Sequence, residues 1–116
     1  MLYAFYGSLR RGLENHLLYS RHMDYRYSMR IRGFKMFSVQ EYPCAIQTQM
    51  QEDSIVVEVF EIQALPVCKE IERMEIEAGY YLDFITLQGR EVAIFLFRDA
   101  KELEEVKGGD WRKFFK

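Results

Sequence analysis

Two short stretches of the 116-residue sequence combine residue types that bind ligands or transfer protons. The first is Tyr6–Leu9, which begins at the last residue of the apolar and aromatic run at positions 2–6. Gly7 permits backbone angles that other residues avoid, so the chain can turn sharply there. Convergent N–H groups in such a turn bind anions, and ligands of α/β sheets commonly lie beyond the carboxyl ends of strands. We therefore predict that Tyr6, Gly7, Ser8 and Leu9 form the floor of a pocket, with an ordinary turn as the alternative.

The same stretch does not match the common nucleotide-binding loops. Gly7 and Gly12 are not part of a Gly-x-x-x-x-Gly-Lys phosphate loop, and the third glycine of the dinucleotide fingerprint is missing. The sequence therefore predicts no nucleotide cofactor here.

The second stretch is the helix predicted from residue 64 to about residue 77. Pro66 suits its first turn, and Gly79 suits the left-handed position just after its end. At about 100° per residue, the apolar positions of this helix form one stripe: Ala64, Val67, Cys68, Ile71, Met74 and Ala78. Glu75 falls inside that stripe, whereas the other charged residues of the helix point elsewhere.

An acid on an apolar helix face has two explanations. Burial would raise the pKa of Glu75 toward the range in which a carboxyl group can both accept and donate a proton. Alternatively, Glu75 lies at the rim of the core and pairs with an arginine, since ion-pair networks also produce such sites.

Other catalytic arrangements lack partners. His16 and His22 have no placement that completes a triad with Ser8, and no metal-ligand spacing includes Cys44 or Cys68. Cys44 follows a proline in a predicted turn and is expected to be accessible, yet no histidine or helix N-terminus is available to activate its thiol. We predict no metal site and retain a thiol mechanism only as a minor alternative.

The composition limits the classes of function that the sequence is expected to have. The formal charge of −2 implies no bulk attraction to nucleic acid or to anionic membranes, and no apolar run reaches the length of a membrane span. The two cysteines lie far apart in the sequence, which favours a reduced, cytoplasmic setting. The first predicted strand starts directly after Met1 and leaves no room for a signal peptide, which favours the same setting. The Arg-Tyr stretch 25–32 resembles a nucleic-acid surface, but a half-buried strand with a basic outer face has the same pattern. The oligomeric state is not predicted.

Residues 1–116 are expected to form one α/β (α+β) domain. Apolar runs, alternation and β-branched residues predict strands at 2–6, 25–32, 34–39, 44–48, 55–62, 80–87 and 91–97. A short helix is expected at 13–19, turns at 41–43 and 88–90, a helical turn at 99–105, a loop at 108–111 and a basic-aromatic end at 112–116. Many strands with one main helix favour a sheet that curls toward a barrel.

Several motifs in this order resemble the γ-glutamylcyclotransferase-like family, which includes the γ-glutamylamine cyclotransferases. Residues 6–12, Tyr-Gly-Ser-Leu-Arg-Arg-Gly, followed by Asn15, resemble its Tyr-Gly-Ser/Thr-Leu-Arg-x-Gly opening. The further matches are Gly33 with Tyr42-Pro43, Val57-Glu58-Val59-Phe60, Ile71-Glu72-Arg73-Met74-Glu75, Gly79-Tyr80-Tyr81 and the tail Gly109-Asp110-Trp111.

The resemblance implies a small mixed β-barrel flanked by one main helix and short helices. It implies a cofactor-free enzyme in which the α-amine of a γ-glutamyl compound attacks its own γ-carbonyl group, which releases 5-oxoproline and a free amine or amino acid. Glu75 matches the family's catalytic acid/base, the Tyr6–Leu9 loop would bind the glutamyl moiety, and Tyr81 would contribute to substrate binding.

The sequence departs from the family after Tyr81, where Leu82-Asp83 replace x-Arg. An altered pocket rim, a different substrate or a lost activity would each follow from that change. A non-catalytic member that binds a small metabolite with the same fold is therefore the alternative function.

Overall fold

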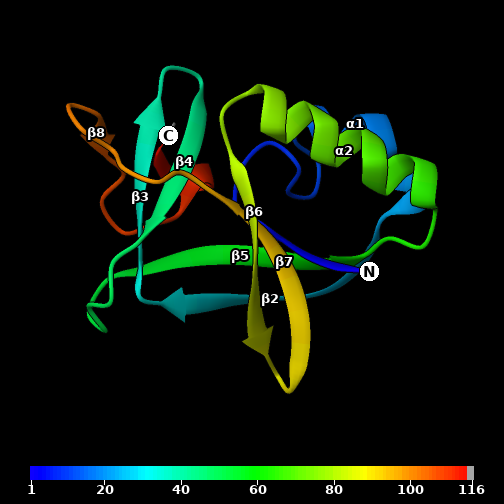
Figure 1. Ribbon diagram of the computed structural model, residues 1–116, viewed down its shortest axis with the longest axis horizontal. Coiled ribbons are helices and arrows are strands. Elements are labelled where there is room, and N and C mark those ends of the chain that lie inside the picture. Colours follow the sequence, from blue (N-terminus) through cyan, green and yellow to red (C-terminus); the bar gives the residue numbers. More distant parts are fainter. Residues whose placement is uncertain (115–116) are drawn as a thin grey trace.

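A computed structural model describes residues 1–114 (Figure 1). Its helices are α1 (Glu14–Tyr19), the 3-10 turn η1 (Ser20–His22), α2 (Leu65–Glu77) and α3 (Trp111–Phe114). Its strands are β1 (Leu2–Phe5), β2 (Asp24–Arg32), β3 (Phe34–Val39), β4 (Tyr42–Gln47), β5 (Ser54–Glu61), β6 (Tyr81–Leu87), β7 (Arg90–Leu96) and β8 (Glu104–Glu105). The α+β class is confirmed.

The strands form two sheets. The larger has the order β2-β5-β1-β7-β6, and β1 at its centre is antiparallel to β5 and parallel to β7. The smaller has the order β4-β3-β8. The pairings within residues 1–114 do not close into one barrel, so the expected barrel is better described as two curled sheets packed together.

The central strand β1 is buried on both faces of the larger sheet, as its apolar run predicts. Side chains alternate between faces along a strand, so Tyr3 and Phe5 join one core cluster while Leu2 and Ala4 join the other. Cys68 and Ile71 of α2 cover the first face, and the smaller sheet covers the second (Figure 1). The carboxyl end of β1 therefore opens between α2 and the smaller sheet.

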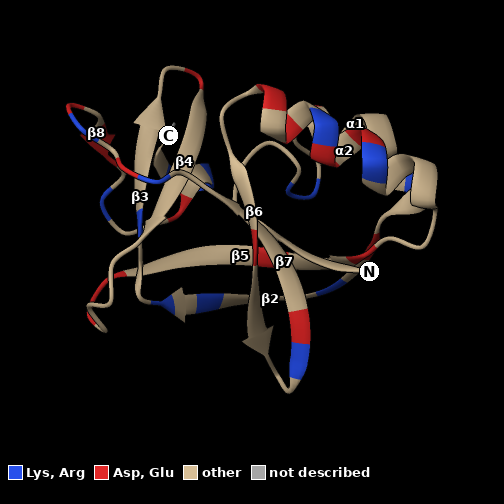
Figure 2. Cartoon of the chain, in the orientation of Figure 1, with Lys and Arg blue, Asp and Glu red and all other residues tan. Residues whose placement is uncertain are grey.

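Helix α2 follows its predicted bounds. Pro66 lies in its first turn and Gly79, with φ of +102°, follows its end. Charged residues occur along the length of the helix (Figure 2), while Cys68 and Ile71 are buried. Val67 and Met74 are partly buried, and Ala78 of the predicted stripe is exposed because the helix ends over an opening rather than over solid core.

Three local predictions are wrong. The turn expected at 41–43 is shorter, because Tyr42 and Pro43 already belong to β4, an edge strand in which proline is tolerated. The expected helical turn at 99–105 ends in β8, whose two residues pair with β3. The loop at 108–111 ends at Trp111, where α3 begins, and the basic-aromatic end continues to residues 115 and 116, which lie outside the described part of the chain.

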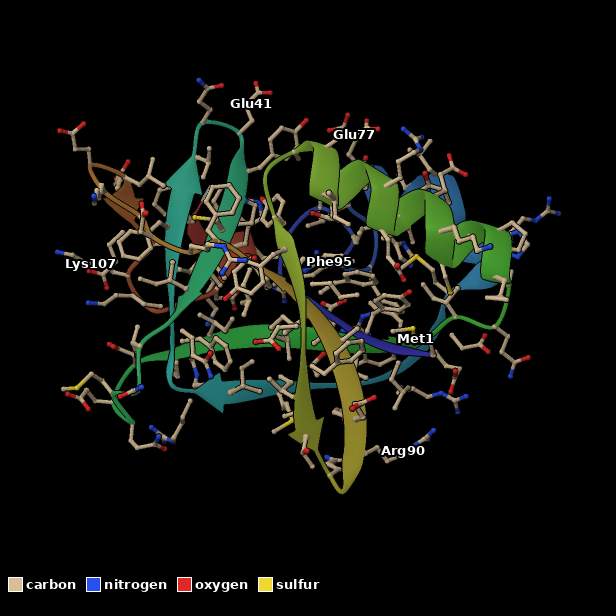
Figure 3. All side chains as sticks on the ribbon, in the orientation of Figure 1. Met1, Glu41, Glu77, Arg90, Phe95 and Lys107 are labelled. Atoms are coloured by element: carbon tan, nitrogen blue, oxygen red, sulfur yellow. The ribbon has the colours of Figure 1, made fainter. Side chains whose placement is uncertain are left out.

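Figure 3 places Phe95 of β7 inside the molecule and Glu77 at its outer surface. No helix within residues 1–114 combines the length and apolarity needed to cross a bilayer.

Candidate active site

A pocket of about 300 Å³ lies beyond the carboxyl end of β1. Its lining comes from four regions that the fold brings together: Ala4–Leu9 with Asn15, the β3–β4 residues Val39, Tyr42 and Pro43, the end of α2 at Met74, Glu75 and Ala78, and Tyr80, Phe95 and Phe97. Of the predicted site residues, Tyr6, Gly7, Ser8, Leu9 and Glu75 are brought together here.

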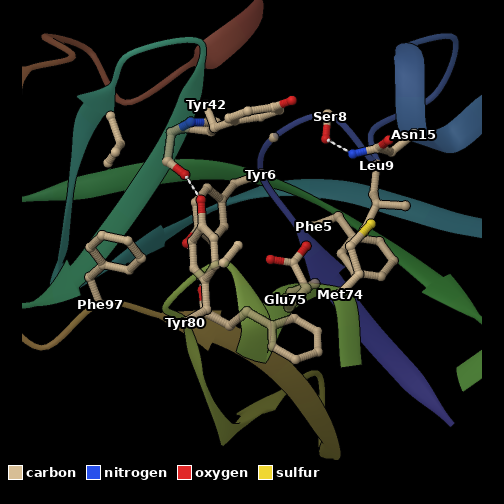
Figure 4. A pocket seen from close by; sticks show the side chains of 16 residues that line it. Phe5, Tyr6, Ser8, Leu9, Asn15, Tyr42, Met74, Glu75, Tyr80 and Phe97 are labelled. Carbon is tan, nitrogen blue, oxygen red and sulfur yellow. Dashed lines mark hydrogen bonds between the residues drawn. The ribbon is translucent and has the colours of Figure 1, made fainter. Parts of the chain in front are cut away.

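Glu75 lies in the last turns of α2, and its carboxyl group points into the middle of the pocket (Figure 4). It forms no ion pair with any residue from 1 to 114; the nearby Arg73 pairs instead with the exposed Glu77, at 3.2 Å. The alternative in which an arginine neutralises Glu75 is therefore not observed. Glu77, two residues further on and on the outer surface of the helix, does not line the pocket.

Burial raises the pKa of Glu75 to about 7. The two neighbouring phenols do not oppose this shift, because both donate their hydrogen bonds elsewhere. Tyr6 Oη donates to the carbonyl of Phe95 at 2.6 Å, and Tyr80 Oη donates to the carbonyl of Pro43. A carboxyl group that is partly desolvated and receives no donor is balanced between its two protonation states near neutral pH.

Tyr6 also fixes the pocket wall. Its hydroxyl oxygen accepts a hydrogen bond from the N–H of Ala45 at 3.1 Å while donating to Phe95, so it connects β1, β4 and β7. Burial raises its pKa well above the usual tyrosine value. Tyr6 is therefore a neutral phenol that ties the two sheets together at the pocket.

The loop after β1 is organised by Ser8 and Asn15. The Ser8 carbonyl accepts hydrogen bonds from the N–H groups of Asn15 and His16, at 3.1 and 3.0 Å. The side-chain amide of Asn15 donates to Ser8 Oγ at 2.7 Å (Figure 4). The N–H groups of residues 7–9 have no acceptor within the described chain, so they are available to a ligand.

Gly7 is required for a close approach rather than for an unusual φ. A Cβ atom at this position would lie 2.8 Å from Cγ of Pro43, inside any normal contact distance. The loop and the smaller sheet are therefore in direct contact at the floor of the pocket.

A cluster of charged side chains supports the loop after β1 on the side away from the pocket. Glu58 of β5 is 1% exposed and accepts hydrogen bonds from Arg10 Nε at 3.0 Å and from the Arg11 N–H at 2.8 Å. Arg10 also pairs with Asp110 at 2.8 Å, and Arg112 lies 3.7 Å from Glu58. Burial alone would raise the pKa of Glu58, but these donors hold it below its usual value. The C-terminal segment is thereby fastened to the loop.

Tyr81, expected at the site, lies outside the pocket lining. It packs against the core cluster beneath the smaller sheet, with the Arg98 guanidinium 4.4 Å from the centre of its ring. Tyr80 lines the pocket instead and packs against Phe97, with ring centres 4.7 Å apart and the rings tilted by 56°. Adjacent residues of an extended chain point in opposite directions, so the pair Tyr80-Tyr81 did not reveal which one faces the site.

Cys44 is fully buried rather than accessible, and burial raises the pKa of its thiol to about 11. Its predicted exposure is wrong because Cys44, which belongs to a strand as predicted, faces inward from β4. Such a thiol is not a nucleophile at neutral pH.

The family follows from a match over almost the whole chain. Residues 3–113 match the family model described as "Gamma-glutamyl cyclotransferase, AIG2-like". The chain belongs to this family, and the resemblance found in its motifs is confirmed.

Solved structures share the fold at low sequence identity. An uncharacterized protein from Pyrococcus horikoshii has a TM-score of 0.83 and 22% identity, over 99% of this chain and 92% of that one. A protein specific to uropathogenic Escherichia coli has a TM-score of 0.80 and 23% identity, over 98% and 94%. A structure named gamma-glutamyl cyclotransferase has a TM-score of 0.61 and 18% identity, over 90% and 69%. No curated protein matches the sequence significantly.

Proposed function

We propose that this protein is a γ-glutamyl cyclotransferase that releases 5-oxoproline and a free amine or amino acid from a γ-glutamyl compound. The observation that carries the proposal is the unpaired carboxyl group of Glu75, with its pKa raised to about 7, in the pocket lined by the Tyr6–Leu9 loop. Family membership supports the same reaction class.

The reaction uses a nucleophile that the substrate itself provides. The α-nitrogen of the glutamyl group attacks the γ-carbonyl carbon, a bond forms between them, and the bond from that carbon to the leaving nitrogen breaks. The protein must hold the flexible chain in a bent conformation close to this geometry. A pocket closed on several sides by Tyr6, Phe5 and Met74 suits that task.

Glu75 would relay protons from the attacking nitrogen to the leaving nitrogen. In its ionised form it accepts a proton from the α-ammonium group, which frees the nucleophile; in its protonated form it donates that proton to the leaving nitrogen, whose bond to the γ-carbon breaks. The second proton, which the α-nitrogen loses as it becomes the ring amide of 5-oxoproline, passes to the released amine, which leaves as an ammonium ion. A pKa near the working pH favours a group that must both accept and donate a proton.

The loop would bind charge. The N–H groups of residues 7–9, which have no acceptor within the described chain, are proposed to hold either the α-carboxylate or the oxyanion that develops on the γ-carbonyl oxygen. Loss of one such donor typically costs about 3 kcal/mol of transition-state stabilisation. Tyr81, which is turned away from the pocket, has no part in this proposal.

The direct test is an assay of the purified protein for 5-oxoproline with a panel of γ-glutamyl amines and γ-glutamyl amino acids. We expect release from at least one compound. If no compound is turned over but one raises the melting temperature, the protein is a small-metabolite-binding member of the fold rather than an enzyme.

A further inference from the structure

The pocket lining is almost free of charge. Of the residues that line it, Glu75 is the single acid, and no lysine, arginine or histidine is among them. The remaining walls are aromatic or aliphatic, with Ser8 and Asn15 grouped on the side of the loop (Figure 4). The other polar side-chain groups of the lining are the hydroxyl groups of Tyr6, Tyr42 and Tyr80, which carry no charge.

From this distribution we infer that the half of the substrate that leaves as an amine is an uncharged alkyl or aryl group, without a carboxylate or an ammonium. The inference rests on the proposed function and specifies its substrate class.

The loop side of the pocket, with Ser8 and Asn15, would bind the glutamyl half of the substrate. Its α-carboxylate matches the unpaired N–H groups of residues 7–9. Another part of the lining consists of Val39, Tyr42, Pro43 and the tilted ring pair Tyr80–Phe97. The Tyr80 hydroxyl in this part already donates to the carbonyl of Pro43. An apolar leaving group would bury its surface here without stranding a polar atom.

A second carboxylate has no cationic partner in this part of the lining. Arg98, which follows Phe97, lies over the ring of Tyr81, and Arg10 is committed to Glu58 and Asp110. A carboxylate in an apolar pocket without a cation is costly, and ionised Glu75 would repel it.

An ammonium on the leaving group would find no acidic partner in the lining other than Glu75. A cation close to Glu75 favours the ionised carboxylate and lowers its pKa. Glu75 would then be a poorer donor to the leaving nitrogen, so the step that completes the reaction would slow.

Matched substrates that differ in one charged group test the inference. γ-Glutamyl-phenethylamide and γ-glutamyl-phenylalanine differ by a single carboxylate, and γ-glutamyl-hexylamide and γ-glutamyl-cadaverine differ by a terminal ammonium. We expect kcat/KM to be at least about tenfold higher for the uncharged member of each pair, the factor that about 1.4 kcal/mol of differential binding produces. Equal or higher kcat/KM for the charged member overturns the inference and leaves the cyclotransferase activity standing.

A charge placed in the apolar wall provides the converse test. Tyr42 is 47% exposed at the pocket, so Tyr42→Arg is expected to fold. The new guanidinium should reduce severalfold the ratio of kcat/KM for γ-glutamyl-phenethylamide to kcat/KM for γ-glutamyl-phenylalanine. Phe84→Arg is the matched control, because Phe84 is 44% exposed on β6 outside the pocket and its replacement adds the same charge. An unchanged ratio in Tyr42→Arg contradicts the inference.

If none of these compounds yields 5-oxoproline, the proposed function fails. Ligand binding, measured as a rise in melting temperature, then shows which kind of leaving group the pocket prefers. A larger rise in melting temperature with γ-glutamyl-phenethylamide than with γ-glutamyl-phenylalanine supports an apolar subsite. An equal or smaller rise overturns it.

Discussion

Arg10 and Glu58 form a buried ion pair, with 3.0 Å between Nε and Oε2, directly behind the loop that lines the pocket. The two side chains are 6% and 1% exposed. Asp110 reaches the other side of Arg10 from the far end of the sequence. The geometry of the loop therefore depends on β5 and on the C-terminal segment as well as on its own residues.

Removing the charge of Glu58 should destabilise the fold strongly. Glu58→Gln leaves Arg10 buried without its main partner, and breaking a buried pair typically costs about 3–5 kcal/mol. The exposed pair Arg73–Glu77 is the control, because Glu77→Gln should change the free energy of unfolding by about 0.5 kcal/mol or less. Urea denaturation of both variants at neutral pH measures the difference. Equal stability of the two would show that the buried cluster does not hold the loop.

Gly7 should resist substitution for steric reasons. In Gly7→Ala the new Cβ would be 2.8 Å from Pro43, so the loop must move away from the smaller sheet. We expect a loss of about 1–3 kcal/mol in stability, as for overpacking, together with a raised KM. Gly12→Ala is the control: its φ of +77° makes alanine unfavourable, but nothing lies within 4 Å. Its KM should stay close to that of the wild type, and a similar KM rise in both variants would contradict the steric account.

The raised pKa of Glu75 predicts an unusual pH dependence of stability. The folded protein holds the Glu75 proton up to pH of about 7, whereas the unfolded chain loses it near 4.5. Between these values the native state binds more protons, so stability falls as pH rises and the loss is complete above 7. Glu75→Gln removes this cost and should be more stable than the wild type at pH 8, by up to about 3 kcal/mol.

The advantage of Glu75→Gln should shrink toward zero at pH 4, where both states of the wild type are protonated. Thermal unfolding across pH 4–8 measures it. A constant difference between the variant and the wild type over that range would mean that Glu75 titrates normally.

Cys44 should be irrelevant to the chemistry. Its thiol is fully buried with a pKa of about 11, so Cys44→Ala should keep kcat within about threefold of the wild type while losing some stability to the cavity. Loss of activity without loss of folded protein, measured by 5-oxoproline release and circular dichroism, would restore the thiol mechanism.

The sequence alone was sufficient where the signal is local and periodic. The apolar run of β1, the alternation of β2 and the helical stripe that includes Glu75 each follow from side-chain spacing. Other features depend on contacts between distant segments. The pairing of β8 with β3 and the contacts of Asp110 and Glu58 with Arg10 have no short-range signature. The orientation of Tyr80 toward the pocket depends on where β6 begins, and strand ends are poorly specified by local pattern.

The central claim is that Glu75 carries the proton during ring closure. The most direct measurement is kcat/KM for 5-oxoproline release by Glu75→Gln, with Glu77→Gln as the control on the outer surface of the same helix. The account predicts a loss of at least about a hundredfold in Glu75→Gln and near wild-type values in Glu77→Gln. Full activity in Glu75→Gln, or an equal loss in both variants, would contradict it.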